Sequence, residues 1–300
     1  MLPRRTSQRA RALPALLIAA LVLVAAAALG ACGDGSEASP SPPMTATATS
    51  SQSPSPTPSG TPVGTTRLSV YFLRDEKLGV AERRVPQTKA VAAAALRELC
   101  SGPTETERVA GLSTAIPNGT ALRSVSISGG VALVDLSSAY DNGGGSLSMT
   151  ARVAQVVYTL TQFPSIKAVS FSLDGAPIST LGNEGVALAT PQRRADWVDF
   201  EPPIFVEFPG VGATLNSPFA LLGTASVFEG AFLAEIRDNS GRRIGRVVVQ
   251  ASLGAPERGD FRKTVVFTTS ATRGSLIVYA QSMEDGSRQD EVRVPVTFAR

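Results

Sequence analysis

The chain has 300 residues, with 28 Lys or Arg, 25 Asp or Glu, two Cys and no His. The length suggests two domains of about 150 residues each. The absence of histidine excludes Ser-His-Asp and Cys-His catalysis and His-ligated zinc, and two cysteines are too few for a four-thiolate metal site or a disulfide framework. We therefore expect no cofactor and no metal. Without the four arginines of residues 1–31 the net charge falls from +3 to −1, so we expect no nucleic-acid partner.

Residues 1–31 have the pattern of an export signal peptide. Four arginines precede an uncharged stretch, residues 12–29, and small residues follow it. The run Leu29-Gly30-Ala31-Cys32 resembles the bacterial lipobox, in which Cys32 receives a diacylglycerol and becomes the new N-terminus. Two alternatives stay open: cleavage after Ala28 by ordinary signal peptidase, and an uncleaved membrane span. The lipobox predicts a lipid-anchored protein on the outer face of the cytoplasmic membrane.

Residues 32–66 form the predicted tether. Of the 34 residues from Gly33 to Thr66, 15 are Ser or Thr, 7 are Pro and none is aromatic. Such a composition buries too little apolar surface to fold. The tether is expected to hold the following domains away from the bilayer.

Residues 67–186 are predicted to form an α+β domain of two layers. We expect a half-buried strand at 67–73, a helix at 88–100, and a capping box in which Thr104 and Glu107 open a short helix. Gly129-Gly130 between two alternating runs indicates a β-hairpin over 121–137. A helix capped by Ser148 is expected to reach Gln162, followed by a strand at 166–173. The order β-α-β-β-α-β places the helices on one side of a sheet.

The alternation of these strands predicts a polar face opposite the helices. Small hydroxyl side chains make a flat surface that another protein can approach closely, although sheet faces that only meet water are common. The residues of this candidate interaction face are Ser69, Tyr71, Ser124, Ser126, Ser128, Ser170 and Ser172.

The motifs of this region resemble the GerMN domain, a sporulation and spore-germination module also found in actinobacterial lipoproteins. They are the segments Ile116–Thr120, Val134–Ser137, Gln155–Pro164 and Val169–Gly175. The resemblance implies a fold similar to the ring-building motifs of secretion-type assemblies, which oligomerise side by side. Sporulation members of that kind carry two tandem copies, whereas this chain has one, which puts a ring in doubt.

Residues 187–202 are predicted to be a linker, in which Trp197 plugs the junction between domains. Beyond it, residues 203–299 contain only short alternating runs separated by turns, which favours an immunoglobulin-like β-sandwich. The seven expected strands are 204–208, 219–227, 231–238, 243–250, 261–268, 276–282 and 291–298.

This second region resembles the immunoglobulin-like domain of bacterial spore-germination proteins, which commonly follows a GerMN domain. The segments that carry the resemblance are Ala225–Gly230, Asp238–Gly241, Gly254–Pro256, Gly259–Phe261 and Asp285–Gly286.

Together these observations predict a protein that is not an enzyme and acts through contacts with an envelope protein or with peptidoglycan, in sporulation, germination or envelope assembly. Self-association into an oligomer is a further expectation. Two alternatives remain: a cell-wall glycan hydrolase that uses Asp135 with a second carboxylate, and an accessory lipoprotein that modulates a sensor kinase. Cys100, on an apolar helix stripe, is expected to be a structural thiol.

Overall fold

The structure, a computed structural model, describes residues 64–182 and 185–299. The signal peptide, Cys32 and nearly all of the predicted tether lie outside the described residues. The described residues all belong to one compact unit.

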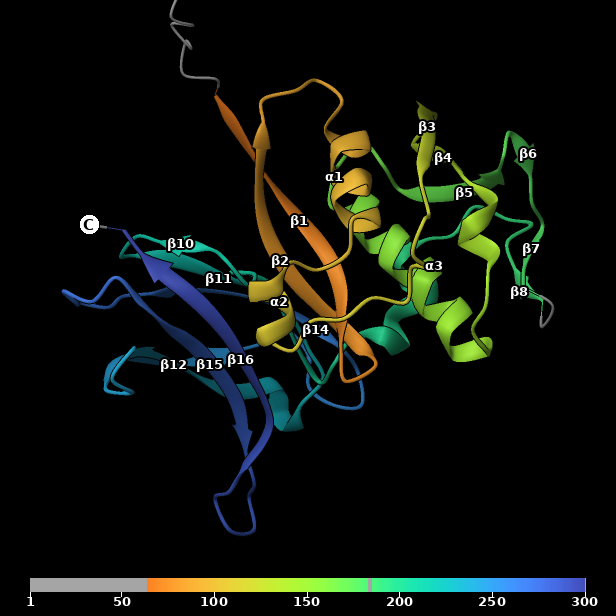
Figure 1. Cartoon of the computed structure of the whole chain (residues 1–300). Coiled ribbons are helices and arrows are strands. Elements are labelled where there is room, and N and C mark those ends of the chain that lie inside the picture. The colour runs from red at the N-terminus through yellow and green to blue at the C-terminus, as the bar shows by residue number, and fades with distance from the viewer. Residues whose placement is uncertain (1–63, 183–184, 300) are drawn as a thin grey trace, which may run out of the picture. The chain divides into compact units, whose positions relative to one another are not determined.

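The first element is a β-hairpin made of β1 (Thr65–Arg74) and β2 (Lys77–Pro86), which pair antiparallel from end to end (Figure 1). The turn residues Asp75 and Glu76 both have positive φ, 49° and 63°, as a two-residue hairpin turn of the primed type requires. The sequence analysis missed β2, because Asp-Glu is not a usual pair for such a turn. It was also wrong to expect a half-buried β1, since both faces of Val70–Leu73 are buried.

Three α-helices follow: α1 (Val91–Cys100), α2 (Glu105–Val109) and α3 (Ser146–Thr161). The capping box of α2 is confirmed, with the Thr104 hydroxyl accepting from the Glu107 amide and the Glu107 carboxylate accepting from the Thr104 amide. The predicted cap of α3 was wrong. Gly145 is the N-cap, and Ser148 lies inside the first turn, where its hydroxyl accepts from buried Arg152 at 3.2 Å.

Helix α3 connects two parallel strands of a four-stranded sheet, whose order is β3-β4-β5-β6. The hairpin around Gly129-Gly130 is confirmed, and both glycines have positive φ. The strands are β3 (Leu122–Ser128), β4 (Val131–Leu136), β5 (Ala168–Leu173) and β6 (Ala176–Pro177). The α+β class is confirmed, but β1 and β2 form a sheet of their own.

The remaining elements up to residue 202 are short. They are a 3₁₀ turn η1 (Ser138–Asp141), the strand pair β7 (Thr180–Leu181) and β8 (Val186–Ala187), and the 3₁₀ segment η2 (Arg194–Phe200). Trp197 in η2 is buried, with its ring 6.3 Å from that of Phe200 in the same segment between centroids; its predicted role as a plug between the domains stays a prediction.

Residues 203–299 fold into the predicted β-sandwich, and all seven expected strands are present. One sheet has the order β10-β16-β15-β12-β13 and the other the order β14-β11-β9. The strands are β9 (Ile204–Phe208), β10 (Thr214–Leu215), β11 (Phe219–Ala225), β12 (Ala231–Asp238), β13 (Arg243–Gln250), β14 (Gly259–Val265), β15 (Arg273–Gln281) and β16 (Arg288–Phe298), and η3 (Phe228–Gly230) precedes β12.

Aromatic and branched side chains fill this core in place of a disulfide bridge. Phe232 of β12 and Phe261 of β14 meet edge to face across the two sheets, with ring centroids 4.9 Å apart. Phe267 and Phe298 make a second contact at the same distance. Most buried apolar residues of both domains belong to one continuous cluster, and each domain also has a small separate cluster.

Candidate interaction surfaces

Five of the seven residues of the predicted polar face share one side of the β3-β4-β5 sheet. The register aligns Ser126, Leu133 and Ser170 in one row across the strands and Ser124, Asp135 and Ser172 in the next. The serines of β3 are exposed and Ser170 is half-buried, whereas Ser172 is buried. Leu133 is 41% exposed, so an apolar side chain stands in the middle of the hydroxyl groups. We call Ser124, Ser126, Ser128, Leu133 and Ser170 the serine face.

Two predicted residues of that face lie elsewhere. Ser69 and Tyr71 belong to β1 in the separate hairpin, where Ser69 is half-buried and Tyr71 only 3% exposed. The amide nitrogen of Ser69 donates to the Gln162 side chain of α3 at 3.0 Å. The prediction that these two residues and Ser172 are exposed with the others was therefore wrong. Tyr71 is covered because its ring packs against Tyr158 of α3 and Phe205 of the second domain.

Tyr71 instead takes part in the junction between the two domains. Its hydroxyl donates to Glu207 of β9 at 2.8 Å and accepts from Arg194 of η2 at 3.3 Å. Arg194 also pairs with Glu207 and lies over the ring of Tyr158, 4.3 Å from its centroid. The three segments β1, η2 and β9, far apart in the sequence, are thereby joined by one charged hydrogen-bonded cluster.

A second cluster lies beside it and centres on Glu201, which is 7% exposed. The Tyr158 hydroxyl of α3 donates to Glu201 at 2.6 Å, and Arg258 pairs with the same carboxylate at 3.2 Å. The Thr224 hydroxyl of β11 also donates to it. Between the two clusters the ring of Phe205 contacts those of Tyr71 and Tyr158, at 6.1 and 6.0 Å between centroids.

The junction is also closed by backbone hydrogen bonds. The amide of Val211 donates to the carbonyl of Val80 in β2, and the amide of Glu82 donates to the carbonyl of Val211, both at 2.8 Å. Gly210 lies so close to β2 that a Cβ there would be 3.0 Å from backbone atoms of Val80, Ala81 and Glu82. The second domain thus covers part of the edge of β2, which otherwise has unpaired backbone groups.

Burial at this junction raises the pKa of both tyrosines well above their usual value of 10. For Tyr71 burial acts together with the charge of Glu207, and for Tyr158 with the hydrogen bond to Glu201. Both hydroxyls therefore remain protonated donors at any physiological pH. The two tyrosines therefore serve the junction as hydrogen-bond donors that hold the domains together.

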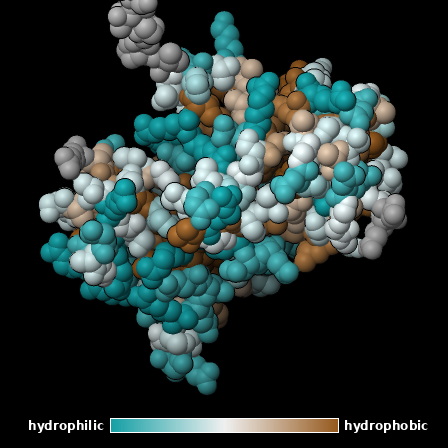
Figure 2. Space-filling view, in the orientation of Figure 1, coloured by the Kyte–Doolittle hydropathy of each residue, from teal (hydrophilic) through white to brown (hydrophobic). Residues whose placement is uncertain are grey.

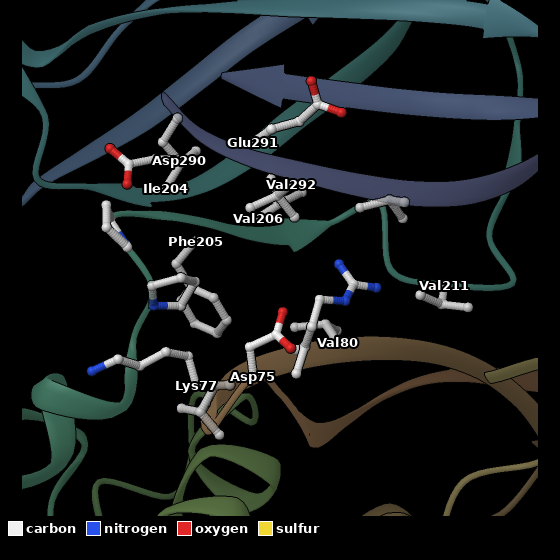
Figure 3. A pocket seen from close by; sticks show the side chains of 16 residues that line it. Asp75, Lys77, Val80, Ile204, Phe205, Val206, Val211, Asp290, Glu291 and Val292 are labelled. Carbon is white, nitrogen blue, oxygen red and sulfur yellow. The ribbon is translucent and has the colours of Figure 1, made fainter. Parts of the chain in front are cut away.

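A cavity of about 180 Å³ opens at the same junction (Figure 3). Its apolar side is formed by Val80, Phe205, Val206 and Val292, and its rim carries side chains of both signs. The rim residues are Arg74, Asp75, Lys77, Asp290 and Glu291. The Lys77 side chain donates a hydrogen bond to the carbonyl of Asp199 at 2.7 Å, and the Arg74 side chain donates one to the carbonyl of Ala110 at 3.0 Å. The cavity is smaller than most ligand pockets.

The carboxylates that the hydrolase alternative requires serve local structure instead. Asp135 accepts from the amide of Gly175 at 2.9 Å, and Asp174 pairs with Arg123 at 2.7 Å. Hydrogen bonds from Ser138, together with Arg123, lower the pKa of Asp174. A general acid needs a raised pKa, so Asp174 is unsuited to that role.

Three further sequence predictions concern metals, thiols and the anchor. Among the described residues, no group of three or more Cys, Asp or Glu side chains is placed to hold a metal ion. Burial raises the pKa of Cys100, which is half-buried, to about 11, as expected of a structural thiol. Cys32 lies outside the described residues, and no helix within residues 64–182 and 185–299 is long and apolar enough to cross a membrane.

The described residues thus form an α+β domain that packs against an immunoglobulin-like sandwich and has an exposed sheet face. Comparison with family models then assigns both parts. Residues 69–179 match the Germane family, described as sporulation and spore germination. Residues 203–287 match Gmad2, the immunoglobulin-like domain of bacterial spore germination. The chain thus carries a Germane (GerMN) domain followed by a Gmad2 domain.

Solved structures with GerMN domains resemble parts of the chain. The tandem GerMN domains of the sporulation protein GerM from Bacillus subtilis have 18% identity and a TM-score of 0.40, over 69% of this chain and 63% of theirs. The first GerMN domain of the same protein has 23% identity and a TM-score of 0.37, over 44% of this chain and 99% of that one. A putative lipoprotein from Clostridium perfringens has 24% identity and a TM-score of 0.34, over 46% and 94%.

The chain therefore spans about 63% of the tandem GerM structure. No curated protein matches the sequence. Neither of the two family descriptions names a catalytic activity.

Proposed function

We propose that this protein is a lipid-anchored, extracytoplasmic protein that acts without catalysis, by contacts between its serine face and an envelope protein, in a spore-related or envelope-assembly process. The observation that carries the proposal is that the two hairpins of the GerMN domain differ in exposure. The β1–β2 hairpin packs against the Gmad2 domain, whereas the sheet on the other side of α3 has an exposed face of small side chains around Leu133.

The composition of that face supports a protein partner. Hydroxyl groups on short side chains lose little rotamer entropy when they are covered, and an exposed leucine among them supplies apolar area to bury. Arg123 and Asp174 at the edge form an exposed ion pair, which is typical of the polar rim of an interface. Both family descriptions, sporulation and spore germination, favour a spore-related process.

A site-specific photocrosslinker tests the contact. Placed at Ser126 in intact cells, it is expected to capture a defined protein, while the same group at exposed Thr264 of β14, in the other domain, captures none. The double variant Ser124→Arg/Ser126→Arg is expected to lose a partner captured through a crosslinker at Ser128. Equal capture from Ser126 and Thr264, or capture that survives the double variant, would contradict the proposal.

The anchor is tested separately with the two cysteines as a matched pair. Cys32→Ala is expected to release the protein from the membrane fraction or to block its processing, and globomycin is expected to leave an uncleaved precursor. Cys100→Ala, which changes a half-buried thiol in α1, should leave both unchanged. A Cys32→Ala protein that is processed and remains with the membrane would exclude the lipid anchor.

A further inference from the structure

The outer face of the five-stranded sheet in the Gmad2 domain concentrates positive charge. Residues 203–299 contain ten basic and ten acidic residues, so the domain as a whole is neutral. The strands β12, β13, β15 and β16 carry six arginines and four acids, and five of the arginines gather around Glu235 and Glu291. The five, which we call the arginine face, are Arg237, Arg243, Arg246, Arg288 and Arg293. In Figure 2 hydrophilic side chains dominate the surface over β12, β15 and β16.

Buried Glu235 is the organising centre of the arginine face. It is 1% exposed, and Arg237 and Arg288 pair with one of its oxygens at 2.7 and 3.2 Å. The Tyr279 hydroxyl donates to the other oxygen at 2.9 Å, and Arg288 lies over the Tyr279 ring, 4.0 Å from its centroid. Burial alone would raise the pKa of Glu235, but the hydrogen bonds from Arg237 and Tyr279 and the arginine charges lower it to about 2.

The other three arginines are held loosely. Arg243 and Arg246 lie 3.5 and 3.8 Å from Glu235, and Arg293 lies 3.5 Å from Glu291, beyond the 2.7–3.2 Å that is typical of an N–H···O hydrogen bond. Their side chains are 50%, 42% and 57% exposed. The five arginines exceed the two carboxylates by three charges, and exposed Asp290, next to Glu291 on β16, reduces this excess to two.

The register places four of the five arginines in two neighbouring rows of the sheet. Arg246, Glu235, Ile277 and Arg293 occupy one row across β13, β12, β15 and β16, and Arg243 and Arg237 occupy the next. With strands about 4.8 Å apart, the first row spans roughly 14 Å. Arg246 and Arg293 lie at the two ends of this row, with Glu235 and Ile277 between them, so a ligand that contacts both arginines must extend across the sheet.

We propose that the arginine face binds a linear, phosphate-bearing polyanion, a function beyond the protein contact of the serine face. Guanidinium groups bind phosphate oxygens in pairs, and the tetrahedral phosphate can bridge arginines of adjacent rows, which a planar carboxylate does less well. A bilayer of anionic lipid fits less well than a chain, because Glu284 and Asp285 lie in the turn between β15 and β16 at the end of the same sheet.

Long-chain polyphosphate is the probe for the test, with the purified full chain and titration by fluorescence anisotropy. The variant Arg243→Gln/Arg246→Gln/Arg293→Gln removes the three exposed charges and keeps Glu235 paired. Its affinity at 0.1 M salt is expected to fall at least about tenfold, and the slope of log affinity against log salt to become shallower by about 2. The matched control Lys89→Gln/Arg262→Gln/Lys263→Gln removes three exposed charges elsewhere and should change the affinity less than about twofold.

Unchanged affinity in the arginine variant, or an equal loss in the control, would overturn the proposal. Two further probes address the nature of the anion. Polyglutamate of matched charge that binds as tightly as polyphosphate would exclude phosphate as the recognised group, and phosphatidylglycerol vesicles that bind while polyphosphate does not would make the face a lipid-binding surface. Thermal unfolding of each variant verifies that the domain is folded.

Discussion

The GerMN domain uses its two β-hairpins in opposite ways. The β1–β2 hairpin is buried on both faces at residues 70–73 of β1 and is joined to the Gmad2 domain by Tyr71, by aromatic packing on Phe205 and by backbone hydrogen bonds with Val211. The β3–β4 hairpin keeps Ser124, Ser126 and Ser128 exposed. Alternating hydrophobicity looks much the same in both, so periodicity alone does not distinguish a strand covered by a second domain from a strand open to a partner.

The largest expected effect is at the junction core. Phe205→Ala removes the ring that contacts Tyr71 and Tyr158 and leaves a cavity between the domains. We expect the free energy of unfolding in urea to fall by about 3–5 kcal/mol. Phe228→Ala, at a position 63% exposed, is the control and should cost less than about 1 kcal/mol. Comparable losses in the two variants would mean that Phe205 does not hold the junction.

The second largest loss of stability is expected at Gly210, whose backbone contacts β2. A Cβ at this position would be 3.0 Å from three backbone atoms of β2, so Gly210→Ala must push the domains apart locally. An expected loss of about 1–3 kcal/mol is measurable by the same denaturation. Gly145→Ala meets no atom within 4 Å and serves as the control, with an expected cost below about 1 kcal/mol from the N-cap preference for glycine over alanine; a Gly210 variant as stable as this control would argue against close backbone pairing.

The stability of the protein at alkaline pH tests the burial of Tyr71 in the β1–β2 hairpin. Its pKa is raised in the folded state, mainly by burial, so the unfolded chain releases this proton first and stability falls as the pH rises above about 10. Tyr71→Phe should cost about 1–2 kcal/mol at neutral pH, because Glu207 and Arg194 lose a partner. Stability of the variant should also fall less steeply above pH 10, as followed by urea denaturation at each pH. Equal slopes for variant and parent would show that Tyr71 is not buried.

The smallest effect is expected on the serine face. Ser124→Arg/Ser126→Arg changes two exposed positions of β3, and the free energy of unfolding should stay within about 0.5 kcal/mol of the parent. A larger loss would show that these side chains are covered in the folded protein, which would remove the contrast between the two hairpins.

Much of the fold follows from local patterns in the sequence. Gly129-Gly130, the Thr104–Glu107 capping box and seven of the eight described strands of the sandwich could be predicted, since each depends on residues close in sequence; the two-residue strand β10 was missed. The β1–β2 turn could not, because Asp75 and Glu76 adopt positive φ only with support from the surrounding structure.

The site was harder to predict than the fold. The serines of β3 were placed correctly by alternation, but Tyr71 was not, because its partners Arg194 and Glu207 lie more than 120 residues away. The arginine face went unnoticed for the same reason: its members come from four strands, and only the register of the sheet brings them together. The net charge of the domain, which is zero, conceals their segregation.

The junction also has a mechanical consequence. A pulling force applied to the chain ahead of Thr65 enters the protein through β1, which pairs with β2 along ten residues. Tyr71 and the edge of β2 are hydrogen-bonded to the second domain. Such a force therefore acts on both domains from the start, and we expect the two domains to unfold together under tension.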